Sequence, residues 1–530
     1  MDYVSSEEDL AALRERVGKE HPDYVAGLLV LAVLYMRRGR REASKELLTR
    51  AITLHKTVFV SDSVDSLASS IKIAHCHALL GERDQSRNIL KSATAALDTV
   101  FEPDSVAYTE SLTCLGRAHT SLDEVSQAEA LYTKALAIQE KTVGPKSVAY
   151  AGTLSSLATL NAGLGHLRLA VDQAEESLVI IRNAAPATYP GPLTNVLLDA
   201  IRMYERIGKF PPAISLCGEL CSIIKNCRDE EHPDNIWSQA FLGRLYYDAG
   251  NYDDAATICQ EVNRLQKKVK DEPPSAYVTN LHFWALACQE RMNYDKALTL
   301  FEELLSLTKT CLPDPDPAAS QVFHHLAGLY RRMGEHVKAE ESYCKAVSLA
   351  KATLGAEHVD YVRAIADLAK LYQEIGKFAE ALTLSEEALT LFNELHPDEK
   401  APRASHLISM ATLYRELDRI PEAIPLYREG LALKRELPGL DSQQHLIYLR
   451  YLAWLHWSNE DWQEALECYE EALPLQRKTL GEKPEEYLDI LDSLITLLDY
   501  FDRNHEAKER RQQAIAIRAE FGIPEPKSDD

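Results

Sequence analysis

The sequence predicts an all-α fold, a solenoid of about twelve stacked helix-turn-helix repeats. A small residue returns every 42 positions, with one step of 43, and the residues between show helical apolar spacing. A fixed period of this length indicates units that contact only their neighbours, without one common core. The series comprises Ala128, Ala170, Ala213, Ala255, Ala297, Ala339, Ala381, Ala423, Ala465 and Ala507, extended toward the N-terminus by Ala43 and Ser86.

Each repeat contains two helical patterns separated by a tight turn. In one repeat, residues 358–375 form the first pattern, Gly376 interrupts it, and residues 378–395 form the second. The first helix has its own small position twelve residues before the Ala series, so two small residues should meet where the helices cross. This position holds Ala74, Gly116, Ala158, Ile201, Gly243, Ala285, Ala327, Ala369, Ala411, Ala453 and Ile495, and in the first repeat Ala32, with a turn one residue shorter.

Start and stop signals divide the chain into three parts. We expect a capping helix in residues 1–20, the solenoid in 21–521 and a disordered polar tail in 522–530. Ser5 and Glu8 suit a capping box for the leading helix. His-Pro-Asp sequences at 21–23, 232–234 and 396–398 precede first helices, where proline and an acidic side chain are favoured. The expected ends of second helices carry glycines, namely Gly18, Gly144, Gly355 and Gly481.

The composition indicates a soluble protein. The net charge is −23, from 81 acidic and 58 basic side chains, which argues against duplex nucleic acid and anionic membranes as partners. The acidic N-terminus predicts no signal peptide, and no apolar run is long enough to span a membrane. We therefore expect a cytoplasmic location. The ten cysteines fall mostly inside helical patterns and are expected to be buried thiols.

A repeated motif indicates the type of solenoid. Leu326, Ala327 and Tyr330 in a first helix are followed by Ala339 and Tyr343 in the second, and the next two repeats are similar. This pattern resembles the tetratricopeptide repeat, and its 42-residue length resembles the kinesin light chain variant. The resemblance implies a right-handed α-solenoid that binds a peptide or partner protein along the concave face of its first helices, without catalysis.

One feature of kinesin light chains is missing. Their repeats carry an L-N-N-L-A motif whose asparagines hold a peptide backbone. The corresponding pairs in this chain are Ser155-Ser156, His324-His325, Ala366-Asp367 and Ile408-Ser409. The resemblance therefore does not extend to backbone clamping or to a kinesin-type cargo role.

Repeats five to eight carry an unusual set of candidate groove residues. Arginine, histidine and aromatic side chains flank the small position of the first helix, and arginine binds carboxylates and phosphates well. We hypothesise that this face binds an acidic or phosphorylated segment. The alternative is that the aromatics pack within the solenoid and the arginines pair with its own carboxylates. The candidates are Arg202, Arg206, Trp237, Phe241, Arg244, Tyr247, His282, Phe283, Gln289, Gln321, His324, His325, Arg331 and Arg332, with Arg363 in repeat nine.

A second candidate lies in repeat eleven, where Tyr451, Trp454 and Trp457 are followed by Trp462. One interpretation is packing against the neighbouring repeat. The other is an anchor pocket for an apolar side chain of the partner.

The sequence contains no recognised enzyme motif of the P-loop, H-E-x-x-H or G-x-S-x-G type. Cys217 and Cys221 share a helix face, so a metal site is conceivable, but Cys217 and Cys259 occupy a slot that holds aromatic residues in other repeats. We interpret them as core thiols and expect no metal or cofactor. The predicted function is a non-enzymatic adaptor for a protein partner, and the alternative is a peptide-responsive regulator whose superhelix changes pitch.

Overall fold

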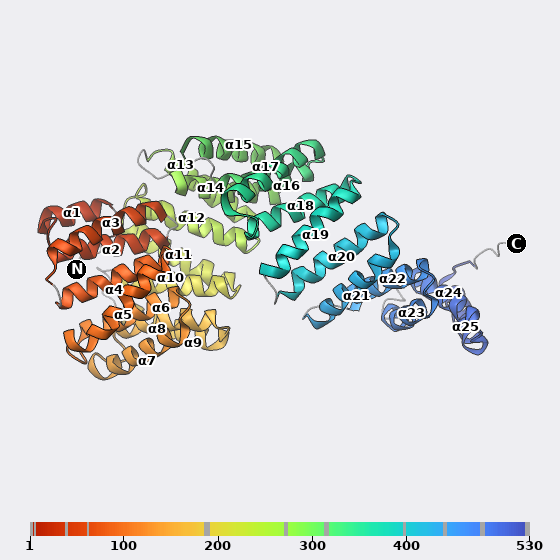
Figure 1. The fold of residues 1–530 in the computed structure, drawn as a ribbon, viewed down its shortest axis with the longest axis horizontal. Helices are drawn as coiled ribbons and strands as arrows, with labels where there is room; N and C mark the ends of the chain where they lie inside the picture. The colour runs from red at the N-terminus through yellow and green to blue at the C-terminus, as the bar shows by residue number, and fades with distance from the viewer. Residues whose placement is uncertain are drawn as a thin grey trace. The chain divides into compact units, whose positions relative to one another are not determined.

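The computed structural model describes residues 4, 7–37, 41–60, 63–184, 191–269, 274–311, 317–395, 399–437, 442–477 and 483–524. Within these residues it contains 25 helices, which form one leading helix and twelve hairpins, as the sequence predicts. The chain divides into two compact parts, an N-terminal block (Met1–Cys311) and a C-terminal block (Leu312–Asp530). Within each block consecutive hairpins stack side by side (Figure 1).

The N-terminal block contains the leading helix α1 (Glu7–Val17) and the hairpins of repeats one to seven. Its first helices are α2 (Pro22–Arg37), α4 (Val64–Leu79), α6 (Val106–Ser121), α8 (Val148–Gly163), α10 (Gly191–Arg206), α12 (Pro233–Asp248) and α14 (Pro274–Glu290). Its second helices are α3 (Arg41–Val58), α5 (Arg83–Val100), α7 (Val125–Thr142), α9 (Leu167–Ala184), α11 (Phe210–Cys227), α13 (Tyr252–Gln266) and α15 (Tyr294–Cys311).

The C-terminal block contains the hairpins of repeats eight to twelve. Its first helices are α16 (Pro317–Arg332), α18 (Val359–Glu374), α20 (Lys400–Glu416), α22 (Ser442–Ser458) and α24 (Pro484–Tyr500). Its second helices are α17 (His336–Leu354), α19 (Phe378–Leu395), α21 (Ile420–Glu436), α23 (Trp462–Gln476) and α25 (Asn504–Phe521).

The small residues lie at the helix crossings, as predicted. Every alanine of the series from Ala128 to Ala507 is fully buried. On the first helix, a Cβ added to Gly116 would come within 2.6 Å of the Tyr132 ring. A side chain at Gly116 would therefore overpack this crossing, whereas the same position in repeats five and twelve holds Ile201 and Ile495.

The register of the first repeat corrects one prediction. Ser44, and not Ala43, is the fully buried residue there. Its hydroxyl donates to the carbonyl of Ala32 at 2.7 Å, as that of Ser86 donates to Ala74 at 2.8 Å. Ala32 and Ser44 are therefore twelve residues apart, as in the other repeats, and a step of 42 residues connects Ser44 with Ser86.

In the hairpins of repeats two to twelve, the turn ends the first helix with one left-handed residue. At Gly376 φ is 79°, and the N–H of Lys377 donates to the carbonyl of Tyr372 at 2.8 Å, the long bond of a Schellman motif. In repeat seven the same position holds Met292, with φ of 59°. A non-glycine residue is strained there, at a cost of about 1–2 kcal/mol.

Side chains cap the starts of several first helices. The His232 ring accepts a hydrogen bond from the N–H of Asp234 at 3.1 Å, and His21 accepts one from Asp23 at 3.2 Å. Serine does the same elsewhere, as where Ser105 caps α6, a signal not recognised in the sequence. The expected start at 396–398, the caps at Ser5 and Gly481, and the tail from 525 lie outside the described residues.

The predicted glycines after second helices have positive φ where the structure describes them. The angles are 89° at Gly18, 85° at Gly144 and 90° at Gly355. Glycine adopts this conformation without the steric cost that a side chain would add.

Candidate partner-binding surface

A cavity of about 400 Å³ lies on the first helices of the N-terminal block. Helices α2, α4, α6 and α8 line it, and they contribute the same repeat positions at steps of 42 residues. One such position holds Ala26, Ala68, Glu110 and Gly152, so most of its side chains are small. This row of short side chains leaves space that larger residues fill in later repeats.

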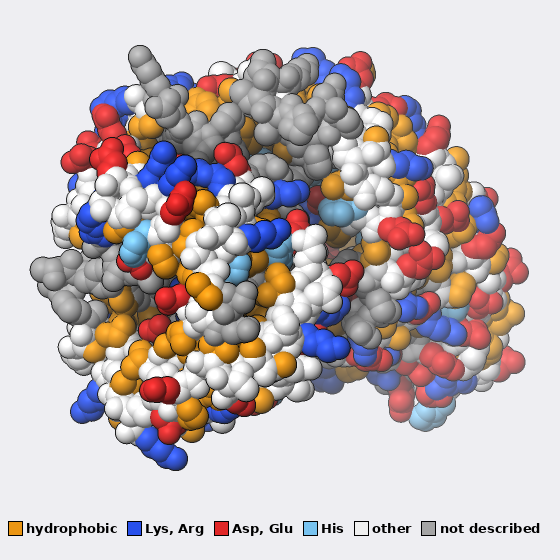
Figure 2. Space-filling model, turned by 60° about the vertical axis from the view of Figure 1, so that its left-hand side comes forward, with side chains coloured by type: hydrophobic (Ala, Val, Ile, Leu, Met, Phe, Trp, Pro, Cys, Tyr) orange, Lys and Arg blue, Asp and Glu red, His pale blue; other side chains and the backbone are white. Residues whose placement is uncertain are grey.

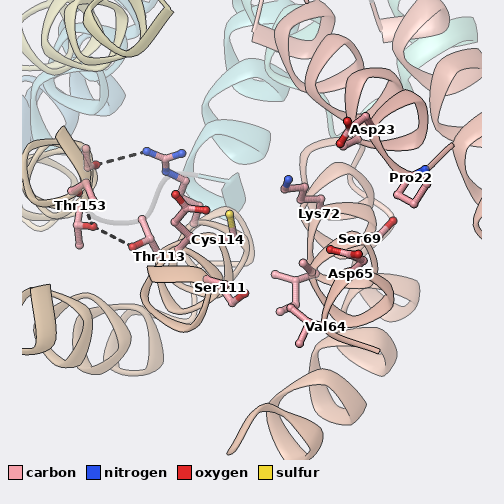
Figure 3. Close-up of a pocket in the computed structure, with 18 of the residues that line it drawn as sticks. Pro22, Asp23, Val64, Asp65, Ser69, Lys72, Ser111, Thr113, Cys114 and Thr153 are labelled. Carbon is pink, nitrogen blue, oxygen red and sulfur yellow. Dashed lines mark hydrogen bonds between the residues drawn. The ribbon is translucent and has the colours of Figure 1, made fainter. Parts of the chain in front are cut away.

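Polar groups occupy the walls of this cavity. Lys72 from α4 and Cys114 from α6 extend into it from opposite sides, and Thr113 and Thr153 share a hydrogen bond of 2.9 Å (Figure 3). The cavity can therefore hydrogen-bond an extended chain as well as enclose it.

Arg117 is a partly buried cation at the edge of the same cavity. Its Nε donates to Ser156 Oγ at 2.9 Å. Burial works against its charge, but Asp199, Cys114 and Tyr132 together outweigh this effect and raise the pKa of Arg117. None of these cavity residues was singled out from the sequence. The sequence signal that could have identified them is the series of small residues Ala26, Ala68 and Gly152. The same repeat position holds Trp237 in repeat six and Arg363 in repeat nine.

The predicted arginines of the N-terminal block lie on α10 and α12. Arg244 donates to Glu205 at 2.6 Å and pairs with Asp248 at 3.3 Å. Burial raises the pKa of Asp248 even though Arg244 opposes the shift. Arg202 is partly buried, whereas Arg206 is exposed, with its guanidinium beside Gly163.

The predicted aromatic residues of this block form ring contacts with one another. Trp237 and Phe241 stack with centroids 5.4 Å apart and pack against a buried core cluster. The Tyr247 and Phe283 rings are 5.7 Å apart and connect α12 with α14. These side chains therefore stabilise the stacking of repeats, with only part of each surface left exposed.

His282 and Gln289 lie mostly inside the solenoid. The His282 ring stands perpendicular to Phe301 at 6.4 Å, and burial lowers the pKa of His282 to about 4. It is therefore uncharged at neutral pH and offers no positive charge to an acidic ligand. Gln289 is buried, and its Oε1 has no hydrogen-bond partner among the described residues.

The predicted cations of the C-terminal block also have carboxylate partners. His324 lies 3.2 Å from Asp367, and Arg331 pairs with Glu374 at 2.8 Å. Burial opposes the charge on Asp367, but its bonds to His324 and Lys370 lower the pKa of this carboxyl below its usual range.

Other predicted groove residues of this block lie near these pairs. The His325 ring is 5.3 Å from that of His324, and Arg332 is exposed. Gln321 and Arg363 both contact Asp360. Most cations of the predicted groove thus have partners within the chain, as the alternative interpretation expects.

The aromatic group of repeat eleven separates into two environments. Tyr451 and Trp454 line a second cavity, of about 470 Å³, and the Tyr451 ring is tilted against that of Tyr427, with centroids 4.6 Å apart. Trp457 instead meets Trp462 at 5.4 Å and packs against the core of the last repeats.

Several cysteines lie in the core of the repeats. Cys217 and Cys259 are fully buried in the core, as predicted, whereas Cys227 and Cys344 are exposed, contrary to the expectation of buried thiols. The nine cysteines whose side chains the structure describes are free thiols. Among the described residues, no cluster of His, Cys, Asp or Glu is suited to hold a metal ion. None of the described helices combines the length and apolar character needed to cross a bilayer. Acidic and basic side chains are interspersed on the face that Figure 2 shows.

Similarity to solved structures concerns the repeats. BtubC (BKLC) from P. vanneervenii is 24% identical over 43% of this chain and 90% of its own, with a TM-score of 0.38. A candidate kinesin light chain from Podosopora anserina with nearly identical TPR-like repeats is 26% identical over 37% of this chain and 93% of its own, at 0.33. The signal transduction ATPase PH0952 from Pyrococcus horikoshii, which has a tetratricopeptide repeat sensor, is 14% identical to this chain. The match covers 92% of this chain and 71% of the ATPase, with a TM-score of 0.48.

Family models match much of the chain. No curated protein matches it. One tetratricopeptide repeat model matches residues 105–183, 277–352, 316–394 and 402–478. Two others match residues 27–65 and 236–261. Since the first model alone spans more than half of the sequence, the chain belongs to the tetratricopeptide repeat family.

Proposed function

We propose that this chain is a non-enzymatic adaptor that captures an extended segment of a partner protein on its first helices. Tetratricopeptide repeats generally have protein partners. The observation that carries the proposal is the cavity on α2, α4, α6 and α8, where short side chains leave room for a chain. Its polar groups, among them Lys72 and Thr113, are suited to hydrogen-bonding such a chain.

The arginines of repeats five to eight favour an acidic or phosphorylated segment. Arg206 is exposed, and a ligand carboxylate or phosphate can bind it directly. At Arg244 and Arg331 the ligand must instead replace an internal carboxylate. Such exchange lowers the gain in affinity, because one ion pair is lost for each one formed.

Charge reversal tests this preference. The double variant Arg244→Glu and Arg331→Glu is titrated calorimetrically with peptides rich in glutamate or phosphoserine that the wild type binds. We expect a loss of affinity of at least about tenfold. Unchanged affinity would contradict the acidic preference.

A matched control is available on second helices. Arg264 bonds to Glu261 at 2.6 Å and Arg435 to Glu471 at 2.7 Å, so reversing both also breaks two ion pairs. The variant Arg264→Glu with Arg435→Glu should keep wild-type affinity. A loss equal to that of the test variant would indicate a general effect of charge.

A peptide-responsive regulator is a second candidate, favoured by one contact. Asp9 on α1 bonds to Arg228 at the end of α11, which connects repeats that are distant in sequence. A ligand that changes the pitch of the N-terminal block has to strain or break this contact. A label pair across it should then report a change in distance on binding, whereas a passive adaptor should give none.

A further inference from the structure

We propose that the cavity between α20, α22 and α24 binds a partner segment in which a large apolar side chain is closely followed by lysine or arginine. The inference deepens the proposed function and rests on it. It assigns a ligand chemistry to one part of the C-terminal block. This cavity selects an apolar side chain with a basic neighbour, whereas the arginines of repeats five to eight select an acidic or phosphorylated segment.

The first argument is the exposure of two large apolar side chains on the wall of the cavity that α22 forms. Ile447 is 58% exposed and Trp454 is 44% exposed. They lie seven residues apart on α22, two helical turns along the same face. Exposed apolar side chains that gather at a cavity mark a binding surface, and tryptophan is among the residues that most often dominate its energetics.

The second argument is that this wall is already held in place. The Tyr451 ring is fixed against Tyr427, and the Arg415 guanidinium lies 5.3 Å from the Tyr451 ring and 5.8 Å from the Trp454 ring. A ligand that enters the cavity of about 470 Å³ therefore has to order few side chains. Less entropy is lost on binding, and affinity gains accordingly.

The third argument is charge. Arg415 pairs with Glu416, and Arg450 pairs with Glu486 at 3.3 Å, so both cations near the cavity are compensated. Asp489 on α24 also lines the cavity and is exposed, and its carboxylate forms no ion pair within the described residues. The uncompensated charge is therefore negative.

This charge selects the residue beside the apolar anchor. A lysine or arginine next to the anchor can pair with Asp489 or lie over the exposed Trp454 ring. An acidic neighbour would be repelled by Asp489. The net charge of −23 on the whole chain further favours a basic segment in its approach.

The experiment selects peptides from a random display library on the full chain and measures the enriched peptides by calorimetry. We expect them to share leucine, phenylalanine or tryptophan with a lysine or arginine close by. Trp454→Ala should weaken their binding roughly thirtyfold. Asp489→Asn should weaken it about two- to fivefold and reduce the preference for a basic neighbour.

The controls separate this proposal from the more general one. Ile515→Ala removes another exposed apolar side chain, 53% exposed on the second helix α25, and should bind like wild type. If Trp454→Ala loses helicity, Ile447→Ser replaces it as the test of the same wall. Peptides that bind both wall variants as tightly as wild type, or that prefer acidic neighbours, would overturn this inference and leave the adaptor function standing.

Two further results would also contradict the inference, namely a failed peptide selection and a dimer formed through the cavity. Failure of the full chain to enrich any peptide would overturn both proposals. A dimer in sedimentation that Trp454→Ala dissolves would mean that a second copy occupies the cavity, which contradicts a peptide ligand.

Discussion

Asp9 on α1 and Arg228 just beyond α11 share two hydrogen bonds of 2.9 and 2.8 Å, although 219 residues separate them. In a solenoid each repeat contacts mainly its neighbours, so this contact is unusual. The leading helix is therefore attached twice, by Leu10 and Leu13 in the core of the first repeat and by Asp9 to repeat five.

Removing the Asp9 charge should loosen α1. We expect Asp9→Asn to destabilise its docking by up to about 1 kcal/mol, since both partners are partly exposed. Amide hydrogen exchange within α1 should then accelerate by up to about fivefold. Glu8→Gln, at an exposed neighbouring position, is the control and should leave exchange unchanged. Equal exchange in the two variants would mean that the Arg228 contact does not hold the helix.

Replacing Met292 by glycine should stabilise the turn of repeat seven. Met292 has φ of 59° and is 77% exposed, so the change relieves backbone strain and removes little packing. The gain should be about 0.5–1 kcal/mol after the entropic cost of glycine. Urea denaturation measures it. The same change at Lys296, in the first turn of α15, should destabilise the protein, because glycine has a low helix propensity and the contact of Lys296 with the Trp284 ring at 4.6 Å is lost.

Enlarging a crossing residue should destabilise a hairpin. Ala369 is 3% exposed where α18 meets α19, and leucine there should cost about 1–3 kcal/mol through overpacking. Glu380→Leu, at an exposed position of α19, introduces the same side chain without a clash. Thermal unfolding should show a lower Tm for Ala369→Leu only. Equal Tm values for the two variants would exclude a tight crossing.

Stability should fall in mild acid because of His282. Burial lowers its pKa to about 4, whereas the unfolded chain takes up a proton near pH 6.5. The unfolded state therefore binds more protons between these values, and stability is lost as pH falls from about 6.5 toward 4. Between pH 7 and 5 we expect a loss of about 2 kcal/mol from this residue.

Two histidine variants check this pH dependence by urea denaturation at both pH values. His282→Phe should reduce the acid-induced loss, whereas His505→Phe should leave it unchanged, because His505 is 87% exposed. A loss of the same size in His282→Phe as in wild type would assign the acid sensitivity to other groups.

The crossings and turns could be predicted because the period fixes which residues recur. The register of the first repeat was predicted wrongly because Ala43 and Ser44 are adjacent small residues, and only packing shows which is buried. Ion pairs such as Arg244 with Glu205 join residues about one repeat apart, and a helical pattern does not determine which carboxylate turns toward which arginine. The cavity on α2 to α8 depends on the size of side chains that repeat stacking brings together.

The most direct test of the central claim is to locate a bound segment. A photo-crosslinking residue is placed in a peptide selected on the full chain, and mass spectrometry identifies the residues it labels. The account predicts labels on first helices, at positions such as Lys72, Cys114 or Trp454 that line the two cavities. Labels confined to second helices, such as α9 or α17, would contradict it.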